Sequence, residues 1–361
     1  MNLSRQLIVK WLSQKGVGIA SASNKSLLRY STNSKPFLTK NYVKKVEPFG
    51  KIFVDIPGDV EIKTTDPHKY SGENTLIVNV YSKNKETPDD IIKVNMSSDT
   101  CEIKSVQSDN ILQGIKCSIQ APPRYDVEVK TTGEGNVDVT GMVSDIINVQ
   151  TEFGNIYGSK LQGQTISLSS SEGGSVTLKN NIQGDIEINT AKNGTIDAEK
   201  CMGTKLDIST ESGNVTIGSN YCEAATFTTA DGKLNLNNLH MDSTVDISGT
   251  GTLNISCLDG SLRANIGEGD AVIQVARITG NSSVTSNGNI LLKIPEDSEN
   301  SISLQADNLN IDKTIDGQYS DDKKIFTIEK NDCKFDVKTE KNIQLTRASW
   351  MDGLNLQKRS G

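Results

Sequence analysis

Apolar and polar residues alternate in short runs through the middle of the chain, and the alternation returns at a regular interval. Strands show this alternation because successive side chains point to opposite faces of a sheet. Each run spans three to five residues and is bounded by Gly, Asn, Asp and Ser, which tight turns favour. The pattern therefore predicts many short strands rather than helices.

The strands belong to a tandem repeat with units of 18 to 20 residues. In each unit an apolar residue is followed by Thr or Ser, then by Gly, and then by two apolar residues with one residue between them, as in ISTESGNVTI at 208–217. No proline occurs between residues 124 and 294, so no strand there lacks a backbone donor. The anchoring glycines are Gly135, Gly154, Gly174, Gly194, Gly213, Gly232, Gly251, Gly269 and Gly288.

One unit of this length cannot bury its own apolar face, whereas stacked units can. We therefore predict an all-β fold, a β-solenoid (parallel β-helix) of about nine coils over residues 127–294. A sandwich or propeller is the alternative, but the repeat is too short for a propeller blade. A third apolar residue, usually followed two places later by a small one, is expected to point inward at a corner: Met142, Leu161, Ile182, Cys201, Cys222, Met241, Leu258 and Ile278.

Hydroxyl residues recur two places after an inward apolar residue: Thr131, Thr151, Ser170, Thr190, Thr210 and Thr229. Since strand residues two apart share a face, we expect these hydroxyls inside a corner, bonded to the backbone of the turn. The alternative is a Thr-rich surface that orders water or ice. The neighbouring outward residues argue against it because they are too mixed: Lys130, Gln150, Ser169 and Asn189.

The flanking regions lack the period. Residues 47–126 and 295–346 also alternate like strands, so we expect irregular β caps over the exposed strand edges, with a tail at 347–361. Residues 1–46 hold nine Lys or Arg and no Asp or Glu. This basic, amphipathic leader is typical of a mitochondrial transit peptide, so we expect a cut near residue 30 and a location in the mitochondrial matrix.

Composition argues against several partners. The chain carries 45 acidic and 38 basic residues, a formal net charge of −7, which disfavours nucleic acid. No apolar run approaches the length of a membrane span. Phosphate-loop and dinucleotide-binding glycine motifs are absent, so no cofactor is expected.

The sequence offers weak candidates for reactive or metal-binding residues. Six cysteines are present without zinc or redox spacing, and Cys201 and Cys222 are expected to pack as small apolar residues in neighbouring coils. The two histidines, His68 and His240, lie far apart in the sequence. His240 precedes the expected inward Met241, so we expect it to face solvent.

A polar column is expected between the inward apolar pairs: Asn148, Ser167, Glu187, Asp207, Thr226, Asp246 and Arg263. In this column Glu187 and Asp207 would be stacked neighbours, and adjacent like charges on a sheet are unfavourable. A bound cation would relieve the repulsion, so a weak calcium site is one hypothesis, and a solvated polar stripe is the alternative. No catalytic, cofactor-binding or metal-binding residue is assigned.

The repeats, preceded by the stretch SIQAPPRYDVEVKTTGEGNVDVTGM that contains Pro123 to Val129, resemble the putative-adhesin β-solenoid family, a domain of unknown function. The chain looks more closely similar to the animal branch of that family, family with sequence similarity 185 member A. The resemblance covers about residues 50–350 and implies the β-solenoid fold. It implies no catalytic residue.

Two functions are consistent with these observations. The first is a non-catalytic binding or scaffold protein in mitochondria that presents a rigid surface to a protein partner. The second is an extracellular or cell-surface adhesin, which glycans on the sequons at Asn193, Asn214, Asn254 and Asn281 would favour. A glycan-active β-helix enzyme is a remote third, because the repeats have few aromatic residues and no insertions to build a groove. Self-association through the solenoid edges stays open.

Overall fold

The computed structural model describes residues 37–66, 74–82, 92–106, 114–330 and 333–348. Within these ranges the regular structure consists of strands, with no helix. The expected leader up to residue 36 and the tail from residue 349 lie outside the described residues.

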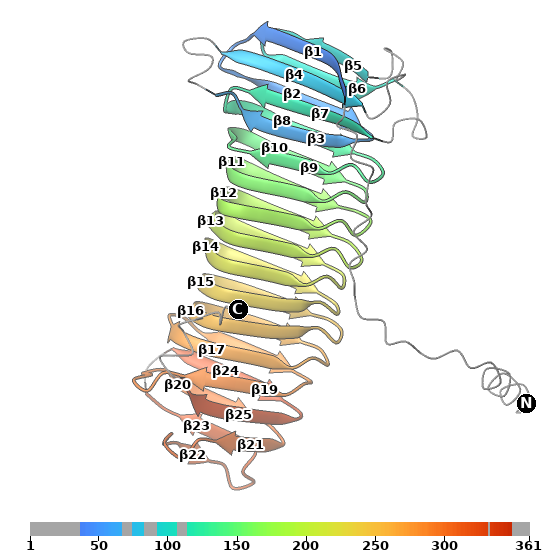
Figure 1. Cartoon of the computed structure of the whole chain (residues 1–361). Coiled ribbons are helices and arrows are strands. Elements are labelled where there is room, and N and C mark those ends of the chain that lie inside the picture. The colour runs from blue at the N-terminus through green and yellow to red at the C-terminus, as the bar shows by residue number, and fades with distance from the viewer. Residues whose placement is uncertain (1–36, 67–73, 83–91, 107–113, 331–332, 349–361) are drawn as a thin grey trace, which may run out of the picture. The chain divides into compact units, whose positions relative to one another are not determined.

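The centre of the fold is a stack of coils whose strands pair in parallel (Figure 1). Each strand from β11 to β16 is 15 residues long and pairs with its neighbours on both sides of a corner. This confirms the predicted β-solenoid. The strands are β8 (Arg124–Thr131), β9 (Val137–Thr140), β10 (Val143–Thr151), β11 (Ile156–Ser170), β12 (Val176–Thr190), β13 (Ile196–Thr210), β14 (Val215–Thr229), β15 (Lys233–Ile247), β16 (Thr252–Ile266), β17 (Ala271–Ile278), β18 (Ser282–Ser286) and β19 (Ile290–Ile294).

The N-terminal end of the stack is closed by antiparallel strands. Its strands are β1 (Phe37–Lys45), β2 (Phe49–Ile56), β3 (Asp59–Thr64), β4 (Thr75–Ser82), β5 (Ile92–Met96), β6 (Thr100–Ser105) and β7 (Ile115–Ala121). β2 and β3 continue the parallel stack from β8 and β9, and β6 and β7 form the next coil outward. β5 and β4 pair antiparallel with that coil, and β1 pairs antiparallel with β4. The parallel ladder therefore ends under strands of opposite direction.

The C-terminal end is closed in a similar way. Its strands are β20 (Ser301–Gln305), β21 (Asn308–Ile311), β22 (Gln318–Tyr319), β23 (Ile325–Ile328), β24 (Lys334–Thr339) and β25 (Asn342–Arg347). β24 and β25 stack in parallel on β18 and β19, and β20 and β21 stack outside them. The chain thus builds the outer coil first and then returns to fill the coil beneath it. β23 and β22 add the antiparallel cover.

The anchoring glycines lie where successive coils come closest. A Cβ on Gly213 would lie 1.7 Å from the carbonyl oxygen of Gly194, and a Cβ on Gly154 would lie 1.8 Å from that of Gly135. These glycines are not among those with positive φ. The glycine recurs in each repeat because the backbones of successive coils come too close at this point for any side chain to fit between them.

The predicted hydroxyl ladder is confirmed. The hydroxyls of Thr131, Thr151 and Thr190 donate to the carbonyl oxygen of the glycine in the same coil at 2.7–2.9 Å. The hydroxyls of Thr210 and Thr229 instead accept from the N–H of that glycine at 3.1 and 3.0 Å. All of these side chains are buried, so the ladder fixes the turn from inside.

Replacing Thr210 by Ala removes its bonds with Gly213 N–H and with the carbonyl oxygen of Gly194 (3.3 Å). We expect the free energy of unfolding to fall by about 1–3 kcal/mol, because both backbone groups lose a partner inside the corner. Thr228→Ala is the matched control, since Thr228 is exposed, and it should change stability by less than about 0.5 kcal/mol. Equal losses in urea denaturation would contradict the ladder's role.

Three of the predicted corner residues lie in another column: Cys222 pairs with Gly203, and Met241 and Ile278 pair with Gly260. Cys222 and Ile278 are still buried, whereas Met241 is not.

Leu239 is fully buried, whereas Met241, expected to point inward, is 53% exposed. β15 is one residue shorter at this corner: Asn220 pairs with Leu239, nineteen residues later, whereas Ala224 pairs with Asp242, eighteen residues later. Met241 closes the shortened corner with a φ of 61°. The inward assignment of Met241 is therefore wrong, because the repeat loses a residue at this corner.

The same shortening corrects the polar column. Thr226 pairs with Thr244, and Thr244 pairs with Arg263. Asp246, which was expected in this column, pairs with Thr228 instead. It therefore lies in the next outward-facing column, two residues further along the strand. The placement of Asp246 is therefore wrong for the reason that applies to Met241.

Candidate functional site: a groove along one corner

A groove of about 760 Å³ runs along one corner of the stack, across β10 to β13 and the first residues of β2 and β8. We call it the corner groove. Its lining includes one glycine from each of β11, β12 and β13, namely Gly163, Gly184 and Gly203, and we call these three glycines its floor. A Cβ on Gly184 would lie 2.0 Å from the carbonyl oxygen of Gly163, and a Cβ on Gly203 would lie 2.0 Å from that of Gly184. Gly184 and Gly203 also have φ values of 146° and 155°, which other residues rarely adopt.

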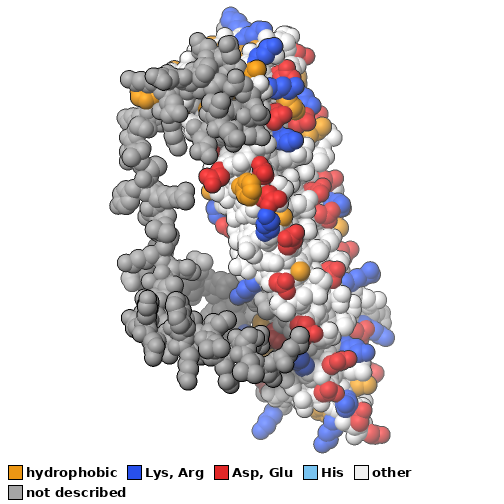
Figure 2. Space-filling model, turned by 90° about the vertical axis from the view of Figure 1, so that its right-hand side faces the viewer, with side chains coloured by type: hydrophobic (Ala, Val, Ile, Leu, Met, Phe, Trp, Pro, Cys, Tyr) orange, Lys and Arg blue, Asp and Glu red, His pale blue; other side chains and the backbone are white. Residues whose placement is uncertain are grey.

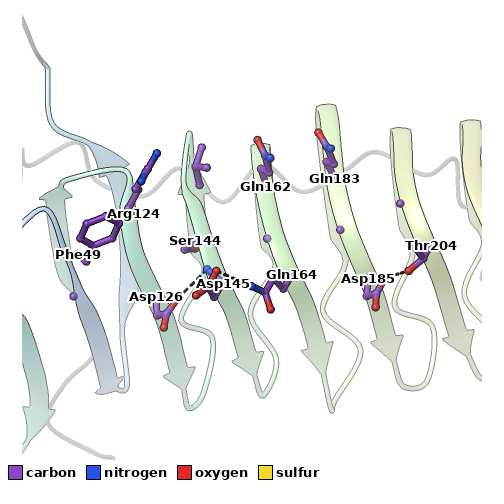
Figure 3. A pocket seen from close by; sticks show the side chains of 15 residues that line it. Phe49, Arg124, Asp126, Ser144, Asp145, Gln162, Gln164, Gln183, Asp185 and Thr204 are labelled. Carbon is purple, nitrogen blue, oxygen red and sulfur yellow. Dashed lines mark hydrogen bonds between the residues drawn. The ribbon is translucent and has the colours of Figure 1, made fainter.

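Two rows of side chains flank the floor (Figure 3). One row contains the exposed Gln162 and Gln183, which are paired in register. Among the described residues, neither amide group has a hydrogen-bond partner. The groove therefore presents two stacked amides, each with donors and an acceptor free.

The opposite row is acidic and already partly bonded. The Gln164 amide donates to Asp145 Oδ1 at 3.1 Å, and the Thr204 hydroxyl donates to Asp185. Asp126 Oδ1 accepts from the backbone N–H groups of residues 145 and 146 at 3.1 and 3.0 Å. These bonds fix the carboxylates along the groove and leave acceptor capacity on each of them.

An aromatic ring with a cation marks one end of the groove. The Phe49 ring is 57% exposed, and the guanidinium of Arg124 lies 5.3 Å from its centroid. A cation at this distance is attracted to the ring face. This end of the groove thus combines the apolar surface of Phe49 with the N–H donors of the Arg124 guanidinium.

The row of glutamines continues along the stack as a column of larger side chains, which we call the aromatic column: Met202, Tyr221, His240, Asp259 and Arg277. The rings of Tyr221 and His240 stack at 4.5 Å with 14° between their planes. The Lys200 ammonium lies 5.1 Å from the Tyr221 centroid. His240 lies on the outer surface but is partly covered by these neighbours, and its Nδ1 lies 3.2 Å from Asp259 Oδ2.

Arg277 stabilises the ionised carboxyl of Asp259. Its Nε donates to Asp259 Oδ1 at 2.7 Å and is the main cause of the lowered pKa of that carboxyl; the bond from His240 adds to it. A lowered folded-state pKa stabilises the fold above the unfolded pKa, and this contribution disappears as pH falls through the folded pKa.

Replacing Arg277 by Leu should raise the pKa of Asp259 toward its ordinary value of about 3.9. A carbon-detected NMR titration of the side-chain carboxyl between acid and neutral pH measures this directly. The matched control is Arg263→Leu, which removes a charge from another column. An unchanged Asp259 titration in the Arg277 variant would show that the bond does not hold the carboxylate.

Glu187 and Asp207 are neighbours in register, as the sequence predicts. A side chain of this chain already supplies positive charge there: the Lys205 ammonium forms an ion pair with Asp207. The bond to Asp207 is the main cause of the raised pKa of Lys205, and the charge of Glu187 contributes. The Asn189 amide also donates to Glu187 at 2.8 Å. Across the described ranges no group of three or more His, Cys, Asp or Glu is arranged to hold a metal ion.

We therefore expect the melting temperature to be the same in calcium and in EDTA. Lys205→Gln should make it calcium-dependent, because the paired carboxylates would then lack a nearby cation. Differential scanning calorimetry on both proteins tests this. A calcium-dependent rise in the unmodified chain would favour the calcium-site hypothesis instead.

Cys201 and Cys222 are fully buried and lie in different columns, paired with Asn220 and Gly203 respectively. Burial raises the pKa of each thiol to about 12, so the reactive thiolate is scarce at neutral pH. His68 lies outside the described residues. In the part of the chain that the structure describes, no helix is long and apolar enough to cross a membrane.

The model of the family Toastrack DUF4097 matches residues 175–349. Solved structures also resemble the chain at low identity. A protein from Parabacteroides merdae described as a putative adhesin has a TM-score of 0.43 and 12% identity, with 86% of this chain and 96% of that chain covered. A putative adhesin from Parabacteroides distasonis has a TM-score of 0.33 and 12% identity, with 85% and 96% covered. A putative lipid binding protein from the same species has a TM-score of 0.30 and 12% identity, with 88% and 98% covered.

These comparisons correct two expectations. The expected location in mitochondria is contradicted: the similar structures are of bacterial proteins described as putative adhesins. The leader on which that expectation rested lies outside the described residues. The closer resemblance to the animal branch finds no support. None of the three similar structures is described as an enzyme.

Proposed function

We propose that this chain is a non-catalytic binding protein that acts as an adhesin outside the cell. The observation that carries the proposal is the corner groove, a concave surface whose floor is backbone held in place by the stack. A preformed site loses little conformational entropy when a ligand binds. The proposal agrees with the descriptions of the similar structures and rests on the geometry of this chain.

The face of the molecule in Figure 2 has the mixed charge of a surface exposed to solvent and to other macromolecules. In the view of Figure 2, acidic and basic side chains are dispersed among uncharged ones, and apolar side chains are isolated. Dispersed charge of both signs keeps a surface soluble and limits unspecific association. Recognition is then left to a defined site such as the corner groove.

Two measurements test the proposed function. Antibodies against the chain should label intact cells that make it, and beads coated with the full chain should retain cells, whereas beads coated with the heat-unfolded chain should not. Labelling that requires permeabilised cells, or equal retention by the unfolded coat, would contradict the proposal.

A further inference from the structure

We infer that the corner groove and the adjoining aromatic column bind a neutral oligosaccharide chain. This inference rests on the proposed binding function and names the ligand class of the same site. The argument combines the length of the surface, its hydrogen-bonding groups, its ring–cation pairs and its charge.

The binding surface is long and narrow. Gln162, Gln183, Met202 and Tyr221 follow one another in register, one to each coil. Adjacent coils are about 4.8 Å apart, so this row spans about 14 Å. A chain-like ligand that lies along the stack would contact these side chains one after another, which a compact ligand cannot do.

The hydrogen-bonding groups suit hydroxyls. A sugar hydroxyl donates and accepts, and the side-chain amides of Gln162 and Gln183 do both. Asp145 and Asp185 on the opposite wall add fixed acceptors within the same groove. An extended peptide fits less well, because it binds by adding to an unpaired strand edge. The strands that line this groove, β11 to β13, pair with a neighbour on each flank, and the ladder is interrupted only over short stretches at the groove, between Gln162 and Thr165 and between Gln183 and Ile186. These gaps lie within the stack and do not form a continuous strand edge.

Two ring–cation pairs lie along the surface. Phe49 with Arg124 lies at one end of the corner groove, and Tyr221 with Lys200 lies in the aromatic column beyond its other end. Phe49 and Tyr221 are 57% and 45% exposed, so both offer apolar surface to the C–H groups of a sugar. Tyr221 offers the exposed edge of its ring, because its faces meet His240 and the Lys200 ammonium. The cations add donors beside that apolar surface.

The charge of the groove disfavours an anionic ligand. Among the described residues that line the groove, Asp126, Asp145 and Asp185 stand against one cation, Arg124. The adjoining aromatic column adds one carboxylate, Asp259, and one guanidinium, Arg277, bonded to each other. The whole chain is also acidic, with a net charge of −7. An anionic polysaccharide would be repelled at this surface, whereas an uncharged one would not.

Affinity electrophoresis of the full chain tests the inference. Native gels would contain dextran, yeast mannan, xylan or galactomannan as neutral probes, heparin as an anionic probe, and unfolded casein as a polypeptide probe. Gln183→Ala and Tyr221→Ala change exposed side chains of the proposed surface. Tyr157→Ala is the matched control, since Tyr157 is 46% exposed and lies in a different column, paired with Asp138 and Thr177.

We expect retardation by at least one neutral polysaccharide, a dissociation constant at least tenfold higher in both groove variants, and no change in Tyr157→Ala. Retardation by none of the neutral probes, equal retardation of the Tyr221 variant, or groove-dependent retention by heparin or casein would overturn the inference. If coated beads retain cells equally well with Gln183→Ala and Tyr221→Ala, the proposed function stands and the oligosaccharide inference fails. If the unmodified chain retains no cells, the proposed function itself fails.

Discussion

Gly213→Ala should lower the free energy of unfolding by at least about 3 kcal/mol or prevent folding. The added Cβ would lie 1.7 Å from the carbonyl oxygen of Gly194 and 2.9 Å from the Thr210 hydroxyl oxygen. The closer atom is backbone in a paired coil, so the overlap can be relieved only by separating two coils. Overpacking against a rigid neighbour belongs to the most destabilising class of substitution. Urea denaturation followed by circular dichroism measures the loss.

Gly280→Ala is the control for this prediction. The nearest atom to its added Cβ is the Ser261 Cβ at 3.4 Å, an ordinary contact, and its φ is not positive. We expect a change of less than about 1 kcal/mol. Comparable losses at both positions would show that flexibility of glycine, rather than coil contact, explains the repeat.

Phe227→Ala should cost about 3–5 kcal/mol, the range for a fully buried aromatic side chain. Phe227 is fully buried and lies two residues from the small, buried Ala225. The backbone ladders to β13 and β15 hold the coil spacing, so the cavity cannot collapse. Tyr157→Ala serves again as the control, because its ring is 46% exposed. A loss below about 1 kcal/mol for Phe227→Ala in thermal or urea denaturation would show that the core can repack.

The repeats and the hydroxyl ladder were predictable because they depend on spacing alone. Strand alternation and the recurring glycine define the stack, and Thr131 to Thr229 follow from the two-residue periodicity of a strand. Met241 was misplaced because a one-residue shortening cannot be located from apolar residues when Leu239 and Met241 both qualify. The order of the C-terminal strands could not be predicted from the apolar pattern either. The pattern gives the position of each strand along the chain, but it does not show that β24 lies between β18 and β20.

The corner groove was missed for a different reason. Grooves on β-solenoids are expected where insertions build walls, whereas this groove arises where side chains are lacking. Gly163, Gly184 and Gly203 were visible as small residues after the corner, and their stacking was the available signal. Gln183, Met202 and Tyr221 are separated by 19 residues, the repeat period, and lie in one row. The row was not predicted because Cys222 was assigned to the apolar corner, where the structure has Asn220.

An NMR titration of the isotope-labelled full chain with the neutral oligosaccharide that binds most tightly tests the central claim most directly. The account predicts that the backbone amide signals of Gly163, Gly184 and Gly203, on the groove floor, shift with added ligand. The signals of Gly154, Gly174 and Gly194, at the anchoring corner, should stay in place. Shifts confined to the anchoring glycines, or no shift at saturating ligand, would contradict the claim that the corner groove is the binding site.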